Sequence, residues 1–441
     1  MTIKIVDDLT QMDYPRYECY KDSGIDWLGE IPESWSTEKG KWLFHKMDRP
    51  IREDDGIVTC FRDGEVTLRS NRRTDGFTNA LKEHGYQGIR KGDLVIHQMD
   101  AFAGAIGVSD SEGKSTPVYS VCVPQEPNKT LPYYYMYFMR SMALRGFILS
   151  LAKGIRERST DFRYNDFAKL DLPIPPYDVQ VKISKFIEHK TIQIEQAINL
   201  KQQQIAKLEE YKQIVIQNAV TKGLNPDAPM KDSGVDWIGD IPTHWEVKKL
   251  KFISRINNST LPEKTDSKLE IKYVDIGSVT FEEGVVRTEA FDFGNAPSRA
   301  RRIAKNHDTI ISTVRTYLKA IDYIDNEKSN YIYSTGFAVL TPNQQIKPKF
   351  LTSFVWSNAF TNQVRDFSKG VSYPAINSSD LGNLFISLPP HEEQKEIIEY
   401  INSKSRQINS SINNIKLGID RLKEYKTILI NQAVTGKIKV V

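Results

Sequence analysis

The sequence predicts an α+β fold, in which two mixed α/β, strand-rich domains are separated by two long antiparallel helices that form a coiled coil. Three observations support this prediction. One sequence block occurs twice, two proline-free stretches carry apolar residues at heptad spacing, and the segments between them hold short runs of β-type residues. Because both halves of the chain share these features, the sequence also predicts a pseudo-twofold repeat.

The composition is typical of a folded protein without a membrane segment. Of the 441 residues, 39% are hydrophobic and 26% are charged, and no apolar run approaches the roughly 18 residues that a membrane helix needs. Cys19, Cys60 and Cys122 form no CxxC pair, which argues against a disulfide framework or a cysteine zinc site and favours a reducing cytoplasm. The net charge of +4 is weak evidence for nucleic-acid binding, so a DNA-binding face would depend on local basic clusters.

The duplicated block is the strongest signal in the chain. Residues 21–32 (KDSGIDWLGEIP) return as residues 231–242 (KDSGVDWIGDIP), and Trp35 returns as Trp245 at the same shift. A chance match of this length is negligible. The chain is therefore a tandem repeat of one structural unit.

A second repeated block closes each half. It comprises a Pro-Pro-x-x-x-Gln motif that ends at Gln180 and again at Gln394, and a later Tyr-Lys…Ala-Val-Thr ending at residues 211–221 and 425–435. The two blocks bracket a divergent middle in each half. Within it, residues 91–96 (KGDLVI) resemble 306–311 (NHDTII), which predicts a turn and then a short apolar strand in both domains.

A long helix is predicted after each proline pair, because prolines are favoured at helix starts and the following stretches lack them. Apolar residues in both stretches recur every seven positions, as in a coiled coil. Polar side chains also lie on this seam, at Lys190, Lys201, Gln204 and Lys404. The alternative to a coiled coil is two surface helices that belong to separate domains. The predicted seam consists of Ile187, Ile194, Leu208, Val215, Ile401, Ile408, Ile415, Leu422 and Leu429.

The order of repeat, divergent domain and long helix, occurring twice, resembles the specificity subunits of type I restriction-modification enzymes. Residues 27–32 (WLGEIP) with their second copy, both proline-glutamine motifs and both Ala-Val-Thr endings carry this resemblance over nearly the whole chain. It implies two target-recognition domains that each read one half of a split site in double-stranded DNA. It also implies helices that dock two methyltransferase subunits, and a motor-nuclease subunit that can join for restriction.

In that family the partner subunits bind S-adenosylmethionine, and ATP and magnesium where restriction occurs, so the resemblance implies no cofactor or metal in this chain and no catalysis of its own. The chain is expected to contain five segments. They are an N-terminal extension at 1–20, a first target-recognition domain at 21–172, a first spacer helix at 173–223, a second target-recognition domain at 231–386 and a second spacer helix at 387–436.

Basic and amide side chains in the divergent middles are the candidate DNA contacts. Arginine and lysine neutralise phosphates, arginine pairs with guanine, and asparagine or glutamine pairs with adenine. For each single residue, a solvated surface charge is the alternative. The candidates are Arg69, Asn71, Arg72, Arg73, Gln98, Lys153, Arg156, Arg158, Arg163, Arg299, Arg301, Arg302, Arg315, Lys319 and Lys369.

Motifs for catalysis are weak. Residues 174–177 (IPPY) lack the polar first residue of an amino-methyltransferase motif, and residues 102–107 (FAGAIG) form a lone glycine loop. Glu270 and Lys272, with Asp266, suggest half of a nuclease site, but an alternating strand explains them equally well. The function alternatives are a coiled-coil scaffold joining two protein-binding domains, and a self-sufficient nuclease or methyltransferase.

Overall fold

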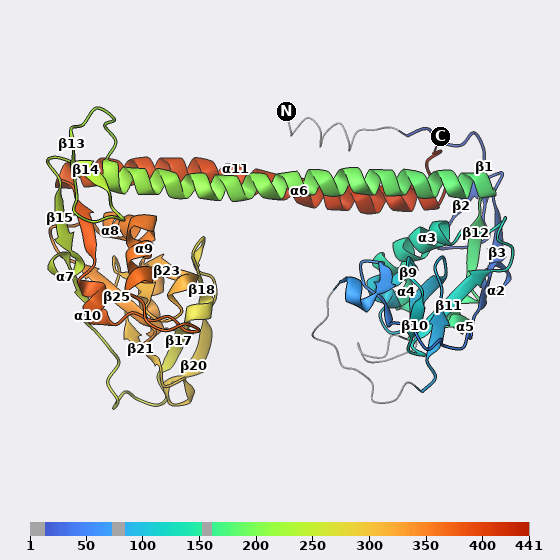
Figure 1. Ribbon diagram of the computed structural model, residues 1–441, viewed down its shortest axis with the longest axis horizontal. Helices are drawn as coiled ribbons and strands as arrows, with labels where there is room; N and C mark the ends of the chain where they lie inside the picture. The colour runs from blue at the N-terminus through green and yellow to red at the C-terminus, as the bar shows by residue number, and fades with distance from the viewer. Residues whose placement is uncertain (1–13, 73–83, 152–160, 441) are drawn as a thin grey trace. The chain divides into compact units, whose positions relative to one another are not determined.

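A computed structural model describes residues 14–72, 84–151 and 161–440 (Figure 1). The chain divides into two compact units, Met1–Lys201 with Lys416–Val441, and Gln202–Ile415. Within the described residues, no helix is both long and apolar enough to span a membrane.

The first unit is built on a four-stranded antiparallel sheet in the order β4-β11-β8-β9. Helix α3 (Pro132–Leu144) starts with a proline and buries Tyr135, Phe138 and Met139 in the core that contains the sheet residues Leu94 and Ile106. The strands of this sheet are β4 Phe44–Lys46, β11 Tyr119–Pro124, β8 Leu94–His97 and β9 Ile106–Val108.

Short antiparallel pairs complete the first unit. They are β1 (Tyr20–Asp22) with β2 (Glu30–Pro32), β3 (Ser36–Lys39) with β12 (Asp171–Ile174), β5 (Val58–Cys60) with β6 (Val66–Leu68), and β7 (Gln87–Ile89) with β10 (Gly113–Ser115). The short helices are α2 Gly40–Leu43, α4 Phe147–Leu151 and α5 Tyr164–Phe167, with 3-10 turns η1 at Arg69–Asn71 and η2 at Ala101–Ala103.

The second unit repeats this framework. Its sheet has the order β16-β25-β22-β23, which corresponds strand for strand to the sheet of the first unit, and helices α8 (Pro348–Trp356) and α9 (Asn358–Phe367) bury their apolar residues in the same core. The strands are β16 Ser254–Ile256, β25 Phe337–Pro342, β22 Thr309–Ser312 and β23 Ile321–Tyr323. The common sheet order confirms the predicted duplication of fold.

The second unit also has a sheet in the order β20-β17-β24-β21, in which β17 and β24 run parallel. Its strands are β20 Glu289–Asp292, β17 Glu270–Val274, β24 Tyr331–Ser334 and β21 Ala300–Ile303. The remaining elements are β13 Met230–Asp232, β14 Asp240–Pro242, β15 Glu246–Lys249, β26 Phe385–Leu388, β18 Val279–Thr280, β19 Gly284–Val285, α7 Leu250–Ile253, α10 Ser378–Gly382, and the 3-10 turns η3 Ile276–Ser278, η4 Phe293–Asn295, η5 Thr316–Leu318 and η6 Lys328–Asn330.

Two long helices carry the heptad pattern, α6 (Tyr177–Lys222) and α11 (His391–Val434), and each contributes one part to each unit. In the first unit, Lys426 Nζ of α11 lies 2.7 Å from Glu195 Oε1 of α6. In the second unit, Lys212 Nζ of α6 donates to Asn409 Oδ1 of α11 at 3.1 Å. Late residues of one helix therefore meet early residues of the other in both units, so the pairs are antiparallel.

The residues of the predicted seam are buried or half-buried along α6 and α11. Leu208 and Ile415 are half-buried, and the other predicted seam residues are buried. Lys201 is also buried, and a Cβ atom at Gly418 would lie 3.3 Å from its Nζ atom. The glycine thus leaves room for the lysine side chain at this position of the seam.

The proline-glutamine motifs tie each long helix to its own domain. Buried Gln180 accepts from Leu131 N–H at 2.9 Å and donates to the carbonyls of Lys129 and Pro175 at 2.8 and 2.9 Å. Leu131 is the residue that precedes α3, so the glutamine satisfies polar backbone groups at the start of that helix.

Gln394 repeats these bonds in the second unit. It accepts from Lys347 N–H at 2.7 Å and donates to the carbonyls of Gln345 and Pro389 at 3.1 and 2.9 Å. Lys347 precedes α8, as Leu131 precedes α3. In both units, the glutamine of this motif therefore links the start of a long helix to the start of a domain helix by hydrogen bonds.

The glycine after each long helix packs on a repeated tryptophan. Gly436 (φ 72°) follows α11, and a Cβ atom there would lie 2.5 Å from Pro32 and 3.0 Å from Trp35. Gly223 (φ 75°) follows α6, and its Cβ atom would lie 3.1 Å from Trp245. Both the left-handed backbone and the close approach favour glycine, and each contact anchors a helix end in the core.

Candidate nucleic-acid interface

In the first unit, the candidates that follow β6 make local contacts. Arg72 forms ion pairs with Asp63 at 2.8 Å and Glu65 at 3.2 Å, and its guanidinium lies 4.0 Å from the centre of the Phe61 ring. Asn71 Nδ2 donates to Thr67 Oγ1 at 2.8 Å. These polar contacts compete with any contact to a nucleic acid, although exposed ion pairs are weak enough to exchange partners.

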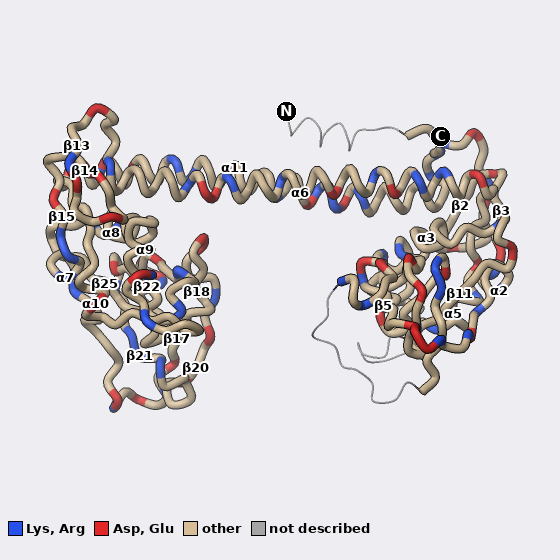
Figure 2. Tube along the Cα trace, in the orientation of Figure 1, with Lys and Arg blue, Asp and Glu red and all other residues tan. Residues whose placement is uncertain are grey.

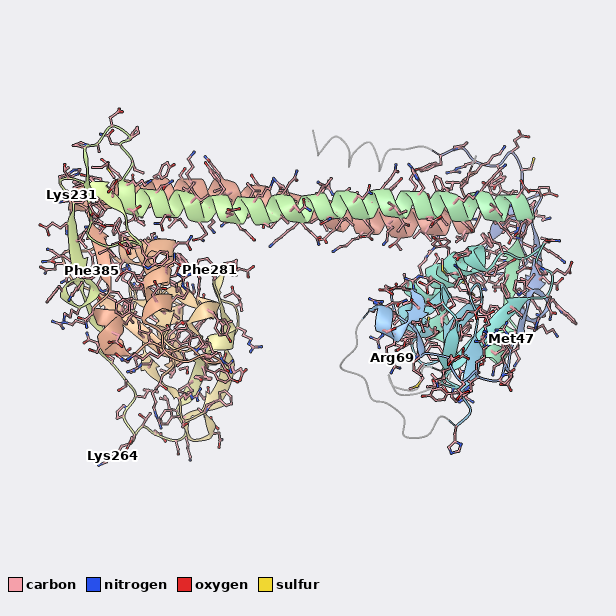
Figure 3. All side chains as sticks on the ribbon, in the orientation of Figure 1. Met47, Arg69, Lys231, Lys264, Phe281 and Phe385 are labelled. Atoms are coloured by element: carbon pink, nitrogen blue, oxygen red, sulfur yellow. The ribbon has the colours of Figure 1, made fainter. Side chains whose placement is uncertain are left out.

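Arg69 begins the η1 turn beside these residues, and its Nε atom donates to Thr59 Oγ1 at 3.4 Å (Figure 3). The structure therefore brings Arg69, Asn71 and Arg72 together at the η1 turn, directly after the β5–β6 hairpin. Arg73, Lys153, Arg156 and Arg158 lie outside the described residues.

Gln98 follows β8, and a backbone hydrogen bond links it to Phe162, the residue before Arg163. The backbone carbonyl of Gln98 accepts from Phe162 N–H at 3.0 Å, next to Arg163. Arg163 is exposed and its Nη2 atom lies 2.7 Å from Asp161 Oδ2, an interaction that raises the pKa of the guanidinium. The amide nitrogen of Gln98 lies 3.4 Å from Ser120 Oγ, which orients the side chain only loosely.

In the second unit, the arginines around β21 have contrasting surroundings. Arg299 is exposed, whereas Arg301 places its guanidinium 4.5 Å from the centre of the Phe293 ring. Arg302 is half-buried, and burial lowers the pKa of its guanidinium. Its Nε atom is buried and makes no hydrogen bond within the described chain.

A turn and a hairpin bring the other second-unit candidates together. Arg315 and Lys319 flank the η5 turn that follows β22, and Lys369 begins a hairpin in which it pairs with Ala375. Thr316 Oγ1 lies 2.9 Å from Ser368 Oγ, and Thr316 N–H donates to the Pro374 carbonyl at 3.3 Å. These bonds hold the turn against the hairpin.

This surface is basic and aromatic. Arg315 places its guanidinium 5.1 Å from the Tyr373 ring centre, and Lys319 Nζ lies 5.4 Å from the ring centre of Phe281, which Figure 3 labels. Burial, and then the neighbouring charge of Arg365, lower the pKa of Lys319.

Sequence reasoning missed Tyr317, Tyr373 and Arg365. The two tyrosines are largely exposed, and each lies within four residues of a basic candidate. That mixture of basic and aromatic residues was the available signal. Arg365 is distant from Lys319 in sequence, so only the folded chain reveals that they are neighbours.

The family described as "Type I restriction modification DNA specificity domain" matches residues 242–420. The putative type I restriction enzyme MjaX specificity subunit of Methanocaldococcus jannaschii is 23% identical over 94% of this chain and 96% of its own length. The MjaVIII specificity subunit of the same organism is 25% identical over 80% of both chains.

Two solved structures have a similar fold. One, described as showing complex assembly and conformational transition of a type I restriction-modification system, has a TM-score of 0.65 at 15% identity, and covers 92% of this chain and 98% of its own. The HsdS subunit from Thermoanaerobacter tengcongensis has a TM-score of 0.51 at 16% identity with the same coverage. The specificity domain matched at residues 242–420 and the two relatives, which match over 94% and 80% of this chain, make it similar to type I restriction-modification specificity subunits, and both solved structures resemble it in fold.

Proposed function

We propose that this chain reads a bipartite DNA target, with one domain for each half-site, as a specificity subunit that docks two methyltransferase subunits on its long helices. The observation that carries the proposal is one sheet order in two units, β4-β11-β8-β9 and β16-β25-β22-β23, combined with divergent residues after the equivalent strands β8 and β22. A shared framework with different turns suits two domains that read different sequences.

Docking on the helices is supported by apolar side chains that face away from the seam. Solvent-facing sides of helices seldom carry large apolar residues repeatedly. Where they do, such residues mark sites of protein contact. Acidic and basic residues are interspersed along both helices (Figure 2). The exposed apolar residues are Ile192, Leu200, Leu417 and Ile428 in the first unit, and Tyr211 and Ile214 in the second.

Catalysis belongs to the partners in this proposal. The described residues contain no group of three or more histidine, cysteine, aspartate and glutamate side chains that could hold a metal ion. Glu270 and Lys272 lie on β17, where the alternation of exposed and buried residues is that of a half-buried strand. Partner subunits would bind S-adenosylmethionine, and ATP and magnesium in any restriction step, in the cytoplasm.

Methylation-motif sequencing tests the proposal. Genomic DNA from cells that carry the chain with its methyltransferase subunit should show methylated adenine in one split motif, and deletion of the chain should remove the motif. A coiled-coil scaffold without DNA contacts would leave the motif unchanged and would show no salt-dependent DNA binding. Either of those results would reject the proposal.

A further inference from the structure

The η5 turn of the second unit has a strained backbone. Arg315 (φ 51°) precedes it and Lys319 (φ 46°) follows it, and both are left-handed. Long side chains rarely adopt this conformation, and strain of this kind is concentrated at functional sites. A strained residue at each end of one three-residue turn therefore indicates a requirement other than stability.

The first unit has the same turn without the strain. Its η2 turn follows β8, the strand equivalent to β22, and is flanked by Asp100 (φ −114°) and Gly104 (φ 91°). Glycine adopts the left-handed conformation readily. The second unit thus has Lys319 at the position where the equivalent turn of the first unit has a relaxed glycine.

The strained turn presents side chains that a soluble domain usually buries. Tyr317 is 60% exposed and Tyr373 of the adjoining hairpin is 66% exposed, and Val371 of the same hairpin is fully exposed. The hairpin is held by two backbone hydrogen bonds between Lys369 and Ala375, of 2.8 and 2.9 Å. The turn and hairpin therefore form one ordered platform with apolar surface at its tip and positive charge around it.

We propose that the turn at residues 315–319 and the hairpin at residues 369–375 together form the base-reading platform of the second domain, in which Tyr317 and Tyr373 contact base edges and Lys319 contacts a phosphate. This inference rests on the proposed function and assigns it to particular side chains. Tyrosine rings give apolar contact to thymine methyl groups and a hydroxyl for hydrogen bonding, and the lysine amine neutralises the backbone. The location of the platform in the divergent middle favours DNA over a methyltransferase subunit, since equivalent docking surfaces would be expected in both copies.

Substitution of Lys319 separates strain from binding. In the complex with its methyltransferase subunits, Lys319→Gly should raise the unfolding temperature or leave it unchanged, because it restores the residue type that the first unit uses. The same variant should weaken DNA binding equally for cognate and altered half-sites, and reduce the salt dependence by about one ion. Lys319→Arg should retain the binding. Unchanged affinity and salt dependence for Lys319→Gly would overturn the phosphate role.

Substitution of the tyrosines should change sequence discrimination and leave the salt dependence of binding unchanged, the opposite of the effect expected for Lys319. Tyr317→Ala and Tyr373→Ala should each reduce discrimination at one half-site by about fivefold or more, with an unchanged salt dependence. Tyr133→Ala, at an exposed tyrosine of the first unit, is the matched control and should leave that half-site unaffected. If both tyrosine variants keep full discrimination while the wild-type complex methylates a defined motif, the platform is rejected and the proposed function stands. Loss of methyltransferase binding in place of discrimination would likewise reject it, in favour of a protein interface.

Discussion

Gln394 allows the packing of a long helix on its domain to be tested by one isosteric change. The substitution Gln394→Glu keeps the acceptor for Lys347 N–H but removes the donor for the carbonyls of Gln345 and Pro389. The bond to the Pro389 carbonyl is buried, and a buried group that loses its partner costs about 1–3 kcal/mol, whereas Gln345 is exposed and water can replace the donor to its carbonyl. For a unit of this size, 1 kcal/mol shifts the unfolding temperature by about 2–4 °C.

The expected result is a fall of at least about 2 °C in the transition of the second unit at neutral pH. Calorimetry would detect it, and hydrogen exchange at the start of α8 would locate it. A buried carboxyl has a raised pKa, and its protonated form regains one donor, so the deficit should shrink as the pH falls. The control is Gln407→Glu on the exposed surface of the same helix, which should change stability by less than about 0.5 kcal/mol. A wild-type transition for Gln394→Glu at neutral pH would refute the reasoning.

Three other predictions concern function. The purified chain should neither methylate nor cut DNA, and activity without a partner subunit would contradict the assignment of catalysis to other subunits. Arg301→Ala with Arg302→Ala should cost about 1–3 kcal/mol for each lost base contact at one half-site only, whereas equal weakening of both half-sites in motif sequencing would indicate phosphate contacts. Insertion of one heptad into both long helices, after Lys201 and after Ile415, adds about 10 Å of helix and should widen the unread gap by about three base pairs. An unchanged gap in an active complex would mean that the helices do not set the spacing.

The repeated framework could be predicted from sequence because it depends on local patterns. Heptad spacing predicted both long helices, since the period of apolar residues directly reports the buried face of a helix. The structure has them at Tyr177–Lys222 and His391–Val434. The sheet order could not be predicted in this way, because hydrogen bonds between β11 and β4 join residues that are far apart in the chain.

The candidate interface was harder to predict for the same reason. Basic residues can be recognised in a sequence, but their surroundings cannot. Arg72 is engaged by two carboxylates, and Arg302 is half-buried beside Arg301, which stacks on an aromatic ring. The platform itself depends on contacts between Thr316 and Ser368, which join the turn to a segment that follows α9.

The sharing of the long helices between units has a consequence for synthesis on the ribosome. The second unit is continuous in sequence, but the first needs the segment Lys416–Val441. Tyr134 Oη donates to the Val434 carbonyl at 2.7 Å, Ser141 Oγ lies 3.2 Å from Asn431 Oδ1, and Gly436 packs on Trp35. The first unit, most of which is translated first, therefore cannot complete its core until the last residues of the chain have been synthesised. Until then it exposes apolar surface that a chaperone would recognise, and a premature stop near the end would impair the first domain more than the second.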